Sequence, residues 1–206
     1  MFDEIGDLLK NEYLIVRFDY TVVNVEENWT KVFSLSEQVI MLTAVHKFIS
    51  VQFNPEEINI IAHSLGCIIV ALSKINNLNK VLLLAGPPSP PYTRLKARFS
   101  ERPETQIDES GISKIKRSDG SITYVPKEFW TELKELEPSI YYKNLTKGSE
   151  VTFVKASEDQ VITDTDFSKL HKIKDIQFLE IQGNHDFENE ARNKLTSLIQ
   201  KLFNLN

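Results

Sequence analysis

The chain has 206 residues, of which 41% are hydrophobic and 26% charged, so it can bury one sizeable core and we expect a single domain over residues 1–206. Its formal net charge of -5 gives no basic surface for a phosphate backbone, which argues against nucleic acid as a partner. Cys67 is the single cysteine, which excludes an internal disulfide and a thiolate zinc site and is typical of a reducing cytoplasm.

The amino-terminal segment predicts a helix and then a strand. Asp3 and Glu4 are acidic where a signal peptide would be basic, and no apolar run is long enough for a membrane span, so we expect a cytoplasmic protein. Helical spacing is shown by Phe2, Ile5, Leu8 and Leu9. The continuous apolar run from Tyr13 to Phe18 then predicts a buried strand.

A second helix and a second strand are predicted next. The helix starts near Ser34 or Ser36. Its expected buried face consists of Val39, Ile40, Thr43, Ala44 and Phe48. After the turn at residues 54–57, the run from Ile58 to Ala62 is too short for a helix and predicts a strand.

The remaining regular elements alternate between helix and strand. Helices are predicted over residues 66–75 and 188–203, and strands over residues 81–85, 151–155 and 176–181. Apolar strands that alternate with helices predict an α/β protein with a mostly parallel sheet covered by helices on both faces.

Residues 87–147 differ from this pattern and predict an insertion over the site, a lid or cap. The segment is rich in proline and mixed charge, with a hairpin turn expected at residues 118–121 and a helix over residues 127–136. It also holds aromatic side chains that either line an acyl pocket or form a core of the lid itself: Tyr92, Phe99, Phe129, Trp130, Tyr141 and Tyr142.

Ser64 lies between a predicted strand and a predicted helix, with the small residues Ala62 and Gly66 two positions to either side. A sharp strand-to-helix turn strains the serine backbone and crowds its neighbours, so we expect side chains larger than a methyl group to collide at these flanks. The turn also directs the hydroxyl toward a helix amino terminus, where N–H groups receive negative charge.

This segment resembles the nucleophile elbow of the α/β-hydrolase superfamily, usually written G-x-S-x-G, with Ala62 in place of the first glycine. The A-H-S-x-G form is similar to that of some small bacterial lipases and esterases. The resemblance implies an α/β-hydrolase fold with Ser64 as the nucleophile, and it covers nearly the whole chain except the insertion.

A serine nucleophile requires a base and an acid, and both occur in the chain order of the superfamily. Asp159 follows the strand over residues 151–155 and precedes two apolar residues, as in the acid loop of the superfamily. His185 follows the strand over residues 176–181, as in its histidine loop. The resemblance thus implies the triad Ser64, His185 and Asp159.

Each of these residues also has a simpler interpretation. A serine before a helix is more often an N-cap, and Glu158 is a rival to Asp159. His63, beside the nucleophile, is expected to point away from it and to be structural. His46 lies in a helix and His171 on a charged stretch, so neither is a strong alternative base.

The resemblance is incomplete at the oxyanion site. The N–H of Leu65 can supply one donor, but the early strand and loop that carry the second donor in the superfamily would precede the first helix of this chain. Either Met1 is an internal methionine of a longer product, or the strands over residues 13–18 and 58–62 pair directly and the site is remodelled. We favour the first and expect an amino-terminally truncated version of the fold.

The sequence predicts a serine hydrolase of ester or related acyl bonds that acts on a small-molecule acyl substrate and requires no cofactor or metal. Two alternatives stay open. One is a degenerate, non-catalytic hydrolase-fold protein that binds a ligand, and the other is a peptidase, thioesterase or acyltransferase that uses the same triad.

Overall fold

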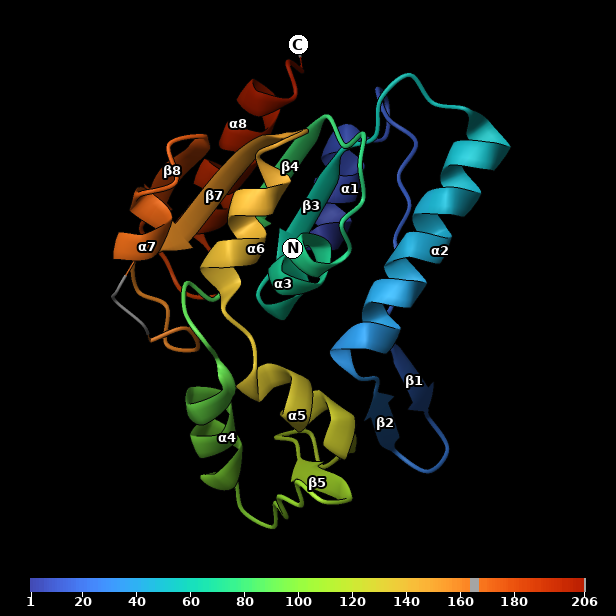
Figure 1. The fold of residues 1–206 in the computed structure, drawn as a ribbon, viewed down its shortest axis with the longest axis vertical. Helices are drawn as coiled ribbons and strands as arrows, with labels where there is room; N and C mark the ends of the chain where they lie inside the picture. Colours follow the sequence, from blue (N-terminus) through green and yellow to red (C-terminus); the bar gives the residue numbers. More distant parts are fainter. Residues whose placement is uncertain (164–166, 206) are drawn as a thin grey trace.

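The computed structural model describes residues 1–163 and 167–205. In chain order its elements are α1 (Phe2–Leu9), β1 (Thr21–Asn24), β2 (Trp29–Val32), α2 (Leu35–Phe53), β3 (Ile60–His63), α3 (Leu65–Leu72), β4 (Lys80–Leu84), α4 (Tyr92–Ser100), β5 (Ile112–Lys116), β6 (Ile122–Pro126), α5 (Lys127–Lys134), α6 (Pro138–Leu145), β7 (Glu150–Ala156), α7 (Ser168–His171), β8 (Ile176–Ile181) and α8 (Glu190–Leu202). Figure 1 shows their arrangement.

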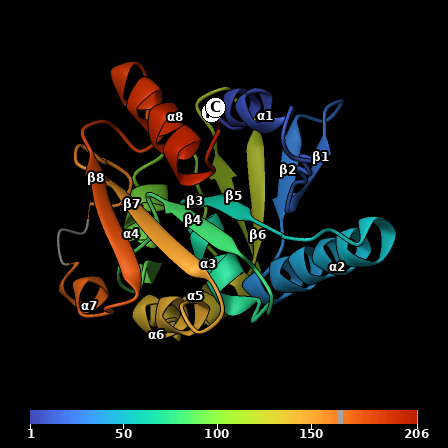
Figure 2. The same ribbon diagram turned by 90° about the horizontal axis from the view of Figure 1, so that it is seen from above.

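The main sheet has four parallel strands in the order β3-β4-β7-β8. Helices α1 and α8 lie on one face, whereas α3 and α6 lie on the other (Figure 2). The predicted parallel sheet with helices on both faces is therefore confirmed. Because its strands are parallel, the loops that follow them all leave the same edge of the sheet.

Side chains alternate along the central strand β4 and separate two cores. Leu82 and Leu84 belong to the core beneath α1 and α8. Val81 and Leu83 face the opposite way, into the core that includes α3 and α6. All four are at most 1% exposed, so this strand is buried on both faces, as the uninterrupted apolar run of the sequence predicts.

A second, mixed sheet has the order β1-β2-β6-β5, in which β2 and β6 run parallel and the other pairs are antiparallel. The expected hairpin turn joins β5 to β6, and Gly120 adopts a φ of 84° there. With α4 and α5 this sheet forms the end of the molecule toward which the arrow of β7 points (Figure 1). We call α4, β5, β6 and α5, together with the hairpin β1–β2, the cap.

The strand predicted from Tyr13 to Phe18 is wrong. The segment has no regular secondary structure, and Tyr13 and Ile15 pack against the core of α1 and α8 while Leu14 is 64% exposed. Among the described residues, however, the backbone of Leu14 to Asp19 makes no hydrogen bond to another backbone group, and β3 pairs only with β4. An apolar run becomes a strand only when a neighbour accepts its hydrogen bonds.

Helix α2 begins where predicted but buries a different face. The Ser34 hydroxyl oxygen accepts the N–H of Glu37, and the Glu37 carboxylate accepts the N–H of Ser34. The two bonds form a capping box. Leu35 and Leu42 are buried, whereas Ile40, placed on the expected buried face, is 66% exposed. The helix carries apolar residues on several faces, so periodicity alone could not select the buried one.

Within the described residues, no helix is both long and apolar enough to cross a membrane.

Candidate active site

Ser64 occupies the sharp turn between β3 and α3. Its φ of 54° and ψ of -129° lie in a strained region for a residue with a side chain, as expected at a strand-to-helix turn. The Ser64 N–H donates to the carbonyl oxygen of Leu84 on the neighbouring strand, over 2.8 Å. Its side chain makes no capping hydrogen bond to α3, so the N-cap interpretation has no hydrogen bond to support it. The strain is held by the sheet on one side and the helix on the other.

The two small flanking residues differ in what surrounds them. Ala62 is buried in the core. A methyl group added at Gly66 would meet no atom within 4 Å, apart from the adjacent backbone of its own helix. Side-chain crowding therefore does not demand glycine at this position of the chain.

His185 and Asp159 form a buried pair at the same edge of the sheet. The Nδ1 atom of His185 lies 2.7 Å from Oδ2 of Asp159, and the two side chains are 10% and 7% exposed. The other carboxylate oxygen accepts the N–H groups of Val161 and Ile162, each over 2.7 Å. The two apolar residues after Asp159 thus fix the carboxylate through their backbone.

The surroundings keep Asp159 ionised. Burial acts to raise the pKa of its carboxyl, but the hydrogen bond from His185 and the N–H donors of Ile162 and Val161 outweigh burial and hold the pKa below its ordinary value. Glu158, the rival acid, instead accepts a hydrogen bond from Gln182 over 3.0 Å. The structure therefore places Asp159, and not Glu158, against the histidine.

The loop that carries His185 is clamped to helix α8. Gly183 allows a close approach, since a methyl group built on it would lie only 2.3 Å from the Ala191 side chain. Arg192, in the first turn of α8, donates to the carbonyl oxygens of Asp186 at 2.7 Å and Phe187 at 3.0 Å. Its remaining nitrogen forms an ion pair with Glu4 of α1 at 2.9 Å.

His63, expected to point away from the nucleophile and to be structural, contacts the loop that carries His185. Its Nε2 atom lies 2.8 Å from the carbonyl oxygen of His185, and the two rings are 4.6 Å apart, tilted by 51°. The ring of Phe2 contacts it edge-on at 6.4 Å. Strand β3 and the histidine loop, which are far apart in the sequence, therefore meet through this side chain. No sequence signal distinguished His63 from a structural histidine.

Leu65 is the first residue of α3, so its N–H is among those that have no partner inside the helix and that attract negative charge. This fits the expected oxyanion donor. In the described part of the chain, β3 is an edge strand of the main sheet, and no strand lies on its other side to bring a second donor loop.

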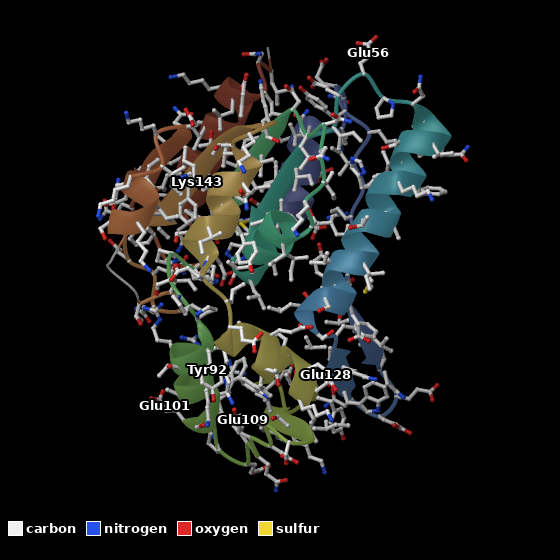
Figure 3. All side chains as sticks on the ribbon, viewed as in Figure 1. Glu56, Tyr92, Glu101, Glu109, Glu128 and Lys143 are labelled. Atoms are coloured by element: carbon white, nitrogen blue, oxygen red, sulfur yellow. The ribbon has the colours of Figure 1, made fainter. Side chains whose placement is uncertain are left out.

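The aromatic residues of the cap gather around Trp130, within the same continuous hydrophobic core that extends to α3 and β4. Trp130 is completely buried, and Tyr92, Phe99 and Phe129 contact its ring edge-on with centroids 5.6 to 6.4 Å apart. Tyr92 also donates to Glu109 over 2.7 Å, and Figure 3 shows both at the cap end of the molecule. These four aromatic side chains therefore pack as part of the hydrophobic core, and Tyr142 packs against Phe153 of the main sheet rather than inside the cap.

The cap also contacts the acid loop. Arg98 of α4 donates to the carbonyl oxygen of Gln160 over 2.8 Å, next to Asp159.

A separate cavity of about 270 Å³ lies at the opposite edge of the sheet, where its lining includes Lys80, Glu150 and Asp175. That cavity is remote from Ser64 and is not part of the site.

Several solved structures resemble the chain. An esterase domain from Rhodothermus marinus superposes with a TM-score of 0.58 at 18% identity, over 80% of this chain and 67% of that one. Est1E from Butyrivibrio proteoclasticus superposes with a TM-score of 0.62 at 15% identity, over 83% of this chain and 70% of that one. A putative hydrolase from Agrobacterium vitis S4 superposes with a TM-score of 0.63 at 15% identity, over 96% of this chain and 80% of that one. The chain has the α/β-hydrolase fold.

At this level of identity the likeness lies in the α/β-hydrolase fold. No protein-family model and no curated protein matches the sequence. Within the described residues of this α/β-hydrolase fold, no three histidine, cysteine, aspartate or glutamate side chains gather to hold a metal ion.

Proposed function

We propose that the chain is a serine hydrolase of ester or related acyl bonds that acts through Ser64, His185 and Asp159. The observation that carries the proposal is the buried His185–Asp159 pair at 2.7 Å, with the second carboxylate oxygen held by two N–H groups. Such a pair leaves the other ring nitrogen of the histidine available as a general base. The strained backbone of Ser64 at the same edge of the sheet supplies the nucleophile.

Acylation begins when Ser64 Oγ attacks the acyl carbonyl carbon while His185 Nε2 accepts the hydroxyl proton. Asp159 stabilises the imidazolium and holds the ring in the tautomer with hydrogen on Nδ1. The Leu65 N–H donates to the oxyanion of the tetrahedral intermediate. Collapse of this intermediate breaks the bond to the leaving group, which takes the proton from His185.

Deacylation repeats these steps with water. His185 Nε2 removes a proton from a water molecule, whose oxygen attacks the acyl carbonyl carbon, and the proton then returns to Ser64 Oγ as the acid departs. A single oxyanion donor is enough for slow turnover, because losing one donor costs about 3 kcal/mol of transition-state stabilisation in a well-studied protease. We therefore propose a slow enzyme.

Within residues 87–147, the elements α4, β5, β6 and α5 act, in this proposal, as a lid in the single domain over residues 1–206, whereas α6 covers the main sheet (Figure 2). The support is the contact of Arg98 with the acid loop and the aromatic packing around Trp130, which anchors these elements to the main core. A cap at the carboxyl edge of the sheet excludes water from the acyl-enzyme and shapes the substrate site.

Labelling with a fluorophosphonate probe tests the proposal. The native chain should be labelled, and Ser64→Ala and His185→Ala should not be. Ser100→Ala and His171→Ala are matched controls at exposed positions, and both should label as the native chain does. A folded native chain that does not react would overturn the enzyme proposal.

A non-catalytic binding protein is the second candidate, and the edge position of β3 favours it. The strand has a hydrogen-bonded neighbour on one side only among the described residues, which leaves the nucleophile turn less enclosed. This candidate predicts a folded chain that binds an ester or acid ligand, detected by calorimetry, with equal affinity in the native chain and in Ser64→Ala. The labelling experiment separates the two candidates.

A further inference from the structure

The side chain of His63, at the end of β3, contacts the loop that carries His185. The residue follows Ala62 and directly precedes Ser64, so its backbone is part of the nucleophile turn. The Nε2 atom of its ring lies 2.8 Å from the carbonyl oxygen of His185. We propose that His63 is a positioning residue that fixes His185 relative to Ser64.

The hydrogen bond determines which tautomer of His63 is present. Its partner is a carbonyl oxygen, which only accepts, so Nε2 of His63 must carry the hydrogen. The bond ties the backbone of the base to the residue next to the nucleophile. The rings then pack at 4.6 Å, which limits the rotation of the His185 side chain about an axis that the Asp159 bond alone leaves open.

The electrostatics suit a neutral side chain at this place. Burial lowers the pKa of His63, although the hydrogen bond to the His185 carbonyl acts to raise it. The groups that face it are His185, Phe2 and the exposed carboxylate of Asp186, 3.9 Å from Nε2. A neutral His63 avoids repulsion of the imidazolium that forms on His185 during catalysis.

This proposal rests on the proposed function, and its test compares substitutions that keep or remove the donor. Glutamine places an N–H near the position of histidine Nε2, whereas leucine has no donor. In His63→Leu the rate constant of phosphonylation should fall about 10- to 100-fold, because an angström of misplacement costs as much. The affinity for the probe should stay unchanged. His63→Gln should recover the rate to within about threefold of the native chain.

A second readout does not require activity. The Nδ1 proton of His185, bonded to Asp159, gives a downfield proton resonance in ¹⁵N-labelled protein. The resonance should persist in the native chain and His63→Gln and broaden or vanish in His63→Leu. His171→Leu, at an exposed ring, is the control and should change neither the resonance nor the rate.

The outcomes are distinct. A folded His63→Leu protein that keeps the native rate and the native resonance overturns the positioning role. If the native chain itself does not react with the probe, the proposed function fails, and the resonance alone decides the role of His63. If circular dichroism shows that His63→Leu is unfolded, His63→Asn takes its place, because its amide is too short to reach the carbonyl.

Discussion

Replacement of Asp159 by asparagine tests the electrostatic core of the site. The amide oxygen can still accept the N–H groups of Val161 and Ile162, which now lie 2.7 Å from the carboxylate. The amide nitrogen would then face Nδ1 of His185 as a donor. Nδ1 of His185 would be forced to act as an acceptor. The hydrogen of the ring would then sit on Nε2, and the base would be in the wrong tautomer.

The expected loss follows from the geometry. A carboxylate 2.7 Å from an imidazolium nitrogen attracts it by about 6 kcal/mol at an effective dielectric constant of 20. Each 1.36 kcal/mol of barrier is a factor of ten in rate. The Asp159→Asn protein should therefore react about 10⁴-fold more slowly, which is also the loss that this change causes in the Ser-His-Asp protease template.

The assay is the second-order rate constant of phosphonylation by a fluorophosphonate, measured beside the native chain and Glu158→Gln. Glu158 lies next to Asp159 but bonds Gln182, so its substitution should leave the rate within about threefold. Circular dichroism verifies that both variants are folded. A rate for Asp159→Asn within tenfold of native would refute the assigned role of the carboxylate.

Four further outcomes follow from the packing and charge of the site. The pKa of Asp159 is depressed in the folded state, so its stabilising contribution is complete above its ordinary value of 3.8 and is lost as the pH falls through the folded value. Chemical denaturation should show the stability gap to Asp159→Asn closing over that range, and a constant gap would contradict it. Gly183→Ala, whose added methyl group would overlap Ala191, should cost about 1–3 kcal/mol of unfolding free energy and slow the probe reaction. A native melting temperature would count against tight packing of the His185 loop on α8. Gly66→Ala should gain about 0.5–1 kcal/mol, and a loss would show crowding at that flank. Trp130→Ala should cost about 3–5 kcal/mol, and a smaller cost would mean that the aromatic packing around this side chain is not part of the stabilising core.

The sequence predicted the parts of the fold that depend on buried strands. β7 is a β-branched and aromatic run that is buried along most of its length, whereas β8 is an edge strand with Gln177 and Glu180 exposed. The bounds of both came out within about two residues. The Asp159 and His185 loops follow those strands directly. Their meeting was predictable because the loops after parallel strands leave the same edge of the sheet.

The errors share a physical cause, which is that the deciding partner is distant in the sequence. The apolar run after Tyr13 lacks a neighbour for its hydrogen bonds, and nothing within the run shows this. The buried face of α2 depends on contacts with α3 and α5, which local periodicity does not contain. The short strands β1 and β2 escaped prediction because they depend on pairing with each other and, for β2, with the distant strand β6.

The contact of His63 with His185 also lay beyond local signals. A histidine before the nucleophile has no periodic or compositional feature that reports what its ring will touch. The contact requires the loop after β8 to reach the carboxyl end of β3, although the two strands are at opposite edges of the main sheet. Only the assembled sheet determines that distance.

The parallel pairing of β2 with β6 links the order of synthesis to the order of folding. The hairpin β1–β2 leaves the ribosome long before Ile122 to Tyr124, the residues that pair with it, have been made. A two-stranded hairpin alone is at best marginally stable in water, and its open edge attracts other strands. The nascent chain must therefore keep this edge unoccupied until the second half arrives, and excision of residues 87–147 would leave it unoccupied permanently. The cap is thus assembled from two segments that are far apart in the chain, so residues 87–147 cannot be exchanged as a separate module.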